Sequence, residues 1–97
     1  MPSEFTYRTE SDSMGSINVP SDKYWGAQTQ RSIENFPIGV ETMPRSLIRA
    51  MGIVKMAAAK ANHTLGFLDD IKSDAILTAA DQVISGNLDN QFPLVIW

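Results

Sequence analysis

PRSLIRAMGIVKMAAAKANHTL, residues 44–65, is the stretch that decides the fold. Its apolar residues recur at alternating steps of four and three, as they do along one face of an α-helix. These residues are Leu47, Met51, Val54, Ala58, Ala61 and Leu65. Pro44 suits a first helical turn, and Gly66 suits the position just after a helix end. The pattern predicts a helix from Pro44 to Leu65 with one continuous apolar stripe.

The same stretch is rich in alanine, at Ala57, Ala58, Ala59 and Ala61. Such small side chains let neighbouring helices approach closely, which implies more than one packing partner. A last helix is predicted from about Asp70 to Ser85, with acidic residues at its start and Gly86 at its end. Its expected inward face consists of Ile76, Ala79, Ala80, Val83 and Ile84.

A β-hairpin is predicted ahead of the helices, between Glu4 and Val19. Polar and apolar residues alternate on both sides of SDSMGS, whose turn-forming residues surround Gly15. The alternating positions are Phe5, Tyr7 and Thr9, then Ile17 and Val19. An isolated hairpin is marginally stable in water, so we expect this one to rest on the helices that follow.

A shorter helix is predicted after Pro20, with Ser21 or Asp22 as its N-cap and Pro37 as its end. Its residues at helical spacing are Trp25, Thr29, Ser32, Ile33 and Phe36. The expected fold is mainly α: a small hairpin followed by about three helices. We expect one domain over residues 1–97, with residues 1–20 as a β-hairpin arm and 21–97 as the helical part.

Composition narrows the classes of protein. A chain of 97 residues with 43% hydrophobic and 20% charged residues suits one globular domain. Its apolar runs are too short for a membrane-spanning helix, and its basic residues are dispersed at a net charge of −3, which argues against a nucleic-acid partner. The absence of cysteine excludes disulfides and zinc fingers and fits a reducing compartment. MPSEFTYRTESD does not have the features of a targeting segment.

Candidate catalytic residues are scarce. His63 is the only histidine, and its place near the exposed side of the long helix favours a surface residue over a functional one. Asp69 and Asp70 fit helix capping better than metal binding. Met51 and Met56 fit core filling better than a partner-binding surface. No phosphate-binding glycine motif is present.

YWGAQTQRS, Tyr24 to Ser32, allows two interpretations. In the first, Trp25 anchors the start of a helix and Arg31 pairs with an acidic residue. In the second, the amides, the hydroxyl and the guanidinium bind a carboxylate ligand. The chemistry of the residues favours the structural role and leaves the second open.

Four stretches resemble the N-terminal region of class II fumarate hydratases, in the fumarase and aspartase superfamily. They are SDSMG at Ser11 to Gly15, VPSDKYWGAQTQRS at Val19 to Ser32, MPRSLIRAMGIVKMAAAKAN at Met43 to Asn62, and FPLVIW at Phe92 to Trp97. The resemblance runs in order along nearly the whole chain. Trp25 and Gln28 stand where aspartases tend to carry other residues, which favours a fumarase.

The resemblance implies reversible hydration of fumarate to L-malate, with no metal or other cofactor. A general base would deprotonate carbon 3 of malate, and a general acid would assist loss of water. In the family these groups come from three segments, contributed by three subunits of a homotetramer, and all lie beyond Trp97. No catalytic, substrate-binding or metal-binding residue is therefore assigned here, and Thr29, Gln30 and Arg31 are expected to support the site structurally.

FPLVIW is expected to be an interior segment exposed by truncation, since in the family a Gly-Ser-Gly-Thr-rich stretch that helps bind the substrate carboxylates follows it. The chain alone is then expected to be inactive. The alternative is a free-standing helical interaction module derived from a fumarase gene. We expect a cytoplasmic location, with the mitochondrial matrix after processing as the alternative.

Overall fold

The computed structural model describes residues 6–96. Within them the chain forms two compact units. One unit consists of residues 6–42 with 93–96, and the other of residues 43–92. The first unit contains a hairpin and a short helix, and the second contains two long helices followed by a 3-10 turn, η1 (Asp89–Gln91). This mainly helical architecture with one small hairpin is the fold that the sequence predicts.

The hairpin consists of β1 (Tyr7–Asp12) and β2 (Gly15–Pro20), paired antiparallel so that Asp12 lies opposite Gly15. Gly15 has φ of 114°, a left-handed conformation that glycine adopts without a steric penalty. Val19 is fully buried and anchors the hairpin in its unit. The predicted hairpin is confirmed, while its first expected residues, Glu4 and Phe5, lie outside the described residues.

The short helix, α1 (Ala27–Asn35), begins later than predicted. Its N-cap is Gly26, which makes no side-chain cap hydrogen bond, so the prediction that Ser21 or Asp22 would cap it is wrong. The residues between β2 and α1 form a loop instead. The side chain of Arg8 on β1 donates hydrogen bonds to carbonyl groups of this segment. The predicted end is confirmed, since the helix stops ahead of Pro37.

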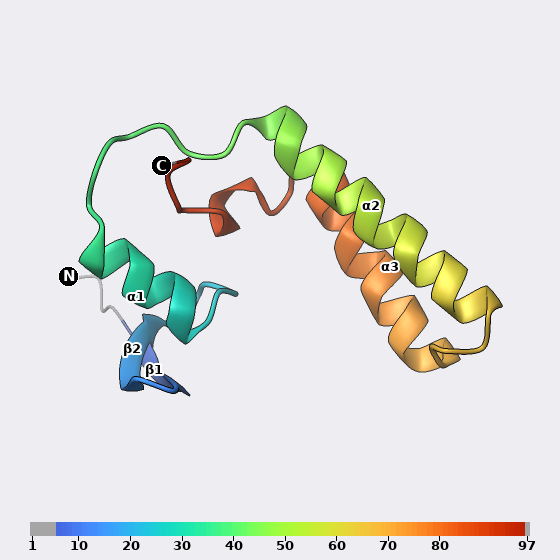
Figure 1. Cartoon of the computed structure of the whole chain (residues 1–97), viewed down its shortest axis with the longest axis horizontal. Helices are drawn as coiled ribbons and strands as arrows, with labels where there is room; N and C mark the ends of the chain where they lie inside the picture. Colours follow the sequence, from blue (N-terminus) through green and yellow to red (C-terminus); the bar gives the residue numbers. More distant parts are fainter. Residues whose placement is uncertain (1–5, 97) are drawn as a thin grey trace. The chain divides into compact units, whose positions relative to one another are not determined.

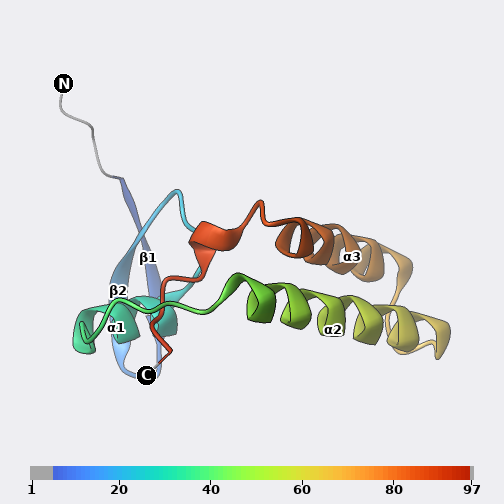
Figure 2. The same ribbon diagram turned by 90° about the horizontal axis from the view of Figure 1, so that it is seen from above.

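The second unit is an antiparallel helix pair, α2 (Arg45–Thr64) and α3 (Asp70–Ser85), which lie side by side in both views (Figures 1 and 2). Both helices are confirmed at nearly the predicted bounds. The cap at Asp69 is also confirmed, since its side chain accepts a 2.8 Å hydrogen bond from the Lys72 amide. Gly86 ends α3 in the left-handed conformation, with φ of 94°.

The face of α2 that meets α3 is a different one from the predicted stripe. The buried residues of α2 are Ile48, Gly52 and Ala59. A Cβ atom on Gly52 would lie 2.9 Å from Cγ1 of Ile84, so glycine is what lets the two helices approach here. The prediction overlooked this face because a glycine adds nothing to an apolar pattern.

The face that α3 turns to α2 was also predicted only in part. Ala80 is buried and Val83 and Ile84 are half-buried, as expected. Ile76 and Ala79 are exposed, and Ser73 is buried at 3% exposure. A serine is small enough to be buried between packed helices, which an apolar pattern cannot indicate.

Residues 93–96 belong to the first unit, where they run beside residues 41 and 42. Val95 forms an isolated antiparallel bridge with Thr42, and the Ile96 amide donates to the Glu41 carbonyl over 2.9 Å. Trp97 lies outside the described residues. Across the described part of the chain, no helix combines the length and apolar character needed to cross a membrane.

Candidate functional site

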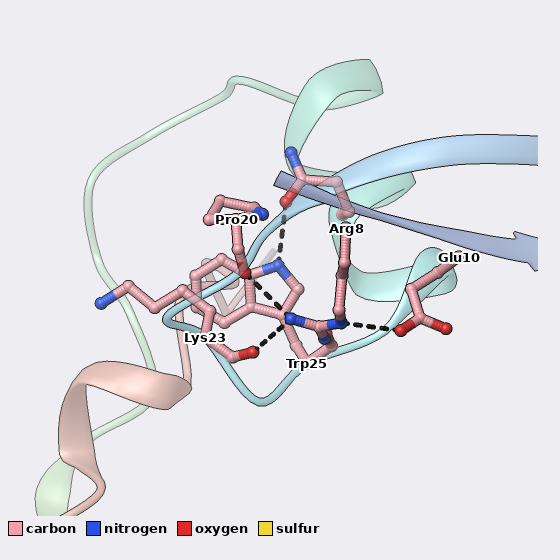
Figure 3. Close-up of polar contacts among 6 residues, drawn as sticks. Arg8, Glu10, Pro20, Lys23 and Trp25 are labelled. Carbon is pink, nitrogen blue, oxygen red and sulfur yellow. Dashed lines mark hydrogen bonds and ion pairs between the residues drawn. The ribbon is translucent and has the colours of Figure 1, made fainter. Parts of the chain in front are cut away.

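Arg8 on β1 is the centre of the most densely connected polar cluster in the first unit (Figure 3). Its guanidinium donates to three backbone carbonyls: those of Pro20 at 2.9 Å, Lys23 at 2.7 Å and Trp25 at 2.5 Å. Its Nε donates to the Glu10 carboxylate at 2.7 Å. The planar fork of an arginine suits such divergent acceptors, since its donors point in several directions in one plane.

This arrangement fixes the loop that leads into YWGAQTQRS. The Lys23 and Trp25 carbonyls belong to the loop between β2 and α1, while the Pro20 carbonyl ends β2 and also accepts from the Lys23 amide at 3.2 Å. The Arg8 guanidinium donates to all three. A buried or partly buried carbonyl without a donor is costly, so Arg8 offsets the cost of this irregular backbone. No sequence pattern indicates this role of Arg8.

Trp25 is attached to α1 through its indole. Its Nε1 donates to Oε1 of Gln30 at 2.9 Å, and Gln30 in turn donates to the Glu34 carboxylate at 3.0 Å. The Lys23 ammonium lies 5.8 Å from the centroid of the Trp25 ring, within the range of a cation–π contact. Trp25 is thus held at the start of α1, which matches the structural interpretation of the motif.

Arg31 joins α1 to the hairpin turn. Its Nη2 and Nε donate to the two carboxylate oxygens of Asp12, at 2.9 and 3.1 Å, and Nη2 also reaches the Gly15 carbonyl at 3.2 Å. The Asp12 side chain is only 9% exposed. The hydrogen bond from Arg31, with help from the Met14 amide, holds the pKa of Asp12 below its ordinary value of 3.8. The expected pairing of Arg31 with an acidic residue is present.

A cavity of about 270 Å³ lies beside this ion pair, between the hairpin turn and α1. Its lining is Asp12, Ser13, Met14, Gln28, Arg31, Ser32, Asn35 and Phe36. Gln28 faces this cavity, while Thr29 is half-buried on α1. Nε and Nη2 of Arg31 already donate to Asp12. The ion pair therefore cross-links α1 to the hairpin rather than offering these two donors to a ligand in the cavity.

The other candidates lie elsewhere. His63 is exposed at the end of α2, and its Nε2 lies 2.5 Å from a carboxylate oxygen of Asp70, which joins the two helix ends. Met51 is 50% exposed and Met56 is half-buried, so core filling describes Met56 better than Met51. Residues 6–96 contain no group of three or more histidine, cysteine or acidic side chains that could hold a metal ion.

Comparison with known proteins places most of this chain, including the YWGAQTQRS motif, in a family. The model of the family described as Lyase matches residues 15–97, which contain β2, all three α-helices and the YWGAQTQRS motif. The chain belongs to the lyase family. The chain is 60% identical over 90 residues to Fumarate hydratase class II 2 of Bradyrhizobium diazoefficiens, a match that covers 93% of the chain and 19% of that relative. It is 57% identical over 91 residues to Fumarate hydratase class II of Halobacterium salinarum, covering 94% and 19%.

The fold of this chain also matches a solved structure. The recombinant class II fumarase from Schistosoma mansoni superposes with a TM-score of 0.89 at 44% identity, over 95% of this chain and 20% of that one. These matches confirm the resemblance to class II fumarate hydratases that the four motifs indicated. The chain spans about a fifth of the length of the relatives it matches.

Proposed function

We propose that this chain is the N-terminal part of a class II fumarate hydratase, which catalyses reversible hydration of fumarate to L-malate. The observation that carries the proposal is the 60% identity to such an enzyme over 90 residues, nearly the whole of this chain. The matching fold at a TM-score of 0.89 supports it. On this proposal residues 1–97 form one lyase domain, with a hairpin arm over 1–20 and a helical part over 21–97.

The part played by this chain is support of the site rather than chemistry. Hydration of fumarate needs a general acid, a general base and groups that stabilise a carbanion. The only histidine, His63, is exposed and pairs with Asp70, and the guanidiniums of Arg8 and Arg31 are occupied by backbone and carboxylate acceptors. We propose that Thr29, Gln30 and Arg31 support the site, and that the catalytic groups lie in the rest of the enzyme.

The resemblance also supports proposals about the oligomeric state, the substrates and the location of the full enzyme. The full enzyme would be a homotetramer acting on fumarate and L-malate in the tricarboxylic acid cycle, without metal, membrane or nucleic-acid partners. Relatives from a bacterium and an archaeon support a cytoplasmic location. The isolated chain would be inactive, because a site assembled from three subunits needs segments that this chain does not supply.

The experiment is capture of the natural gene product from its source cells with an antibody raised against this chain, followed by intact mass and a fumarate hydration assay. We expect a species several times heavier than 10.7 kDa that hydrates fumarate. The recombinant chain, assayed in parallel, should show no turnover. Turnover by the isolated chain, free of the longer enzyme, would contradict the proposed location of the catalytic groups.

A second candidate function is a free-standing interaction module. The exposed apolar residues of α2, among them Val54 at 64% and Leu65 at 65% exposure, favour it, because such a surface is typical of a binding face. A captured species of 10.7 kDa, together with a stop codon directly after Trp97 in the natural gene, would favour this candidate.

A further inference from the structure

Arg45, the first residue of α2, carries a charge that its own helix disfavours. The positive end of a helix dipole lies at the start of the helix, so a cation there is destabilising. The Arg45 guanidinium donates to the Ile84 carbonyl, in the last turn of α3. Because α2 and α3 are antiparallel (Figure 1), the negative end of the α3 dipole offsets that cost. The contacts of Arg45 with other elements therefore account for its presence here.

Asp89 in η1 pairs with the same guanidinium. Its Oδ2 lies 3.0 Å from Nε of Arg45, and the two side chains are 41% and 38% exposed. Nη1 of Arg45 and Oδ1 of Asp89 are buried and bind no other group among the described residues, so each side chain depends on the other for compensation of its charge. We call this arrangement, Arg45 with the Ile84 carbonyl and Asp89, the Arg45 clasp.

Gly86 leaves room for the Arg45 clasp. A Cβ atom on Gly86 would lie 3.2 Å from both Nε and Nη2 of Arg45, and 3.5 Å from Oδ2 of Asp89. The glycine that ends α3 therefore also lets the guanidinium lie close to the backbone. The Arg45 clasp joins three parts of the second unit: the start of α2, the end of α3 and η1.

The Arg45 clasp lies beside both points at which the chain passes between the two units. The chain enters the second unit two residues before Arg45 and leaves it three residues after Asp89. Two connecting segments, residues 41–44 and 90–96, thus run from the clasp into the first unit, where their far ends pair with each other. The same two segments are held together at both of their ends.

We propose that the Arg45 clasp stabilises the pairing of residues 41–42 with 95–96 and so couples the two units. With the clasp closed, both connecting segments start from fixed points, which lowers the entropy lost when their far ends pair. Without it, the fixed part of the second unit ends at Gly86. The flexible connection then becomes roughly one and a half to two times as long, which weakens the pairing by roughly two- to threefold. All contacts of the clasp lie within residues 45–89, so this coupling depends neither on the rest of a longer protein nor on the proposed function.

Amide hydrogen exchange of the full chain, followed by NMR, tests this coupling. In Arg45→Met the Ile96 amide, which donates to the first connecting segment, should exchange roughly two- to threefold faster, because exchange reports how often its hydrogen bond opens. Asp89→Asn, a smaller change, should act in the same direction. Arg49→Met is the matched control, since Arg49 is an exposed arginine one turn further along α2. The Ala59 amide in α2 should exchange alike in all of these chains, which shows that the helix pair stays folded.

A second measurement uses the reciprocity of such coupling, since each contact must stabilise the other equally. Ile96→Pro removes the amide that donates to Glu41, and it should speed exchange of the Arg45 Nε–H, which faces Asp89, by a similar factor. Ile96→Ala keeps the amide and is the control. Exchange of the Ile96 amide that is unchanged in Arg45→Met, or raised as much in Arg49→Met, would overturn the proposal. An Arg45 Nε–H that exchanges alike in Ile96→Pro and Ile96→Ala would overturn it as well.

Discussion

The Arg31 guanidinium on α1 binds both carboxylate oxygens of Asp12, which closes the hairpin 19 residues earlier in the chain. Two parallel N–H···O bonds fix both the distance and the orientation of the two elements. Together with the bonds from Arg8 to the loop before α1, this pair holds YWGAQTQRS between two fixed ends. The motif is therefore a rigid connection between the hairpin and the helix.

Arg31→Lys should lower the melting temperature of the chain, and Arg31→Ala should lower it further. Lysine keeps the charge but loses the two-pronged bond, while alanine also leaves the Asp12 carboxylate without its partner. Thermal denaturation followed by circular dichroism measures both. Arg49→Ala, at an exposed position on α2, is the control and should melt as the parent does. Equal melting temperatures for Arg31→Ala and the parent would show that the ion pair contributes nothing.

The Asp12 carboxylate should make stability depend on acid pH. Its pKa is depressed in the folded state, so the unfolded state binds the proton more readily and the stabilisation is complete well above the ordinary value of 3.8. It is lost as the pH falls below that value and through the folded-state pKa. Urea denaturation at a series of pH values measures this, and Asp12→Asn should flatten that part of the profile. An identical profile for the variant would assign the acid sensitivity to other carboxylates.

Arg8→Lys should destabilise the first unit by about 1–3 kcal/mol, because an ammonium cannot reach three carbonyls and a carboxylate together. The loop should loosen as well. A Trp97→Phe background leaves Trp25 as the only tryptophan, so its fluorescence reports on the loop directly. A red-shifted and more readily quenched emission is expected. Emission and stability like those of the background would mean that the loop holds its shape without Arg8.

Gly52→Ala should destabilise the helix pair by about 1–3 kcal/mol, since the new methyl group would overlap Ile84 and Val83 of α3. Gly26→Ala is the matched control, because a Cβ there meets nothing within 4 Å and φ is −107°. Chemical denaturation compares the two variants. If Gly52→Ala were as stable as the control, the close approach of α2 and α3 would not depend on glycine.

The sequence predicted the elements well and the packing faces poorly. Periodicity placed α2 and α3 almost to the residue, because proline, aspartate and glycine mark their ends. It identified an apolar stripe on α2 whose residues are exposed, and it did not indicate the face around Gly52 that meets α3, because apolarity alone ranks Leu47 and Val54 above a glycine. The face that meets α3 is visible only in the structure, where Ile48, Gly52 and Ala59 are buried.

The polar site was predicted in outline only. Pairing of Arg31 with an acidic residue followed from its residue type, but nothing local identified Asp12 as the partner. The hydrogen bonds of Arg8 were not predicted. Its three backbone acceptors are carbonyl groups, and no sequence pattern shows which carbonyls a loop leaves unsatisfied. The α1 cap was misplaced too: the helix begins after Gly26, and carbonyls on both sides of Ser21 and Asp22 accept from Arg8 rather than from a helix turn.

The central claim is tested most directly by exchanging the matched segment. In a chimera this chain replaces the 90 matching residues of the Bradyrhizobium diazoefficiens relative, and fumarate hydration is followed through the loss of its ultraviolet absorbance. The account predicts a folded chimera that hydrates fumarate, while the isolated chain at the same concentration does not. A chimera that folds and assembles like the parent enzyme yet hydrates no fumarate would contradict it.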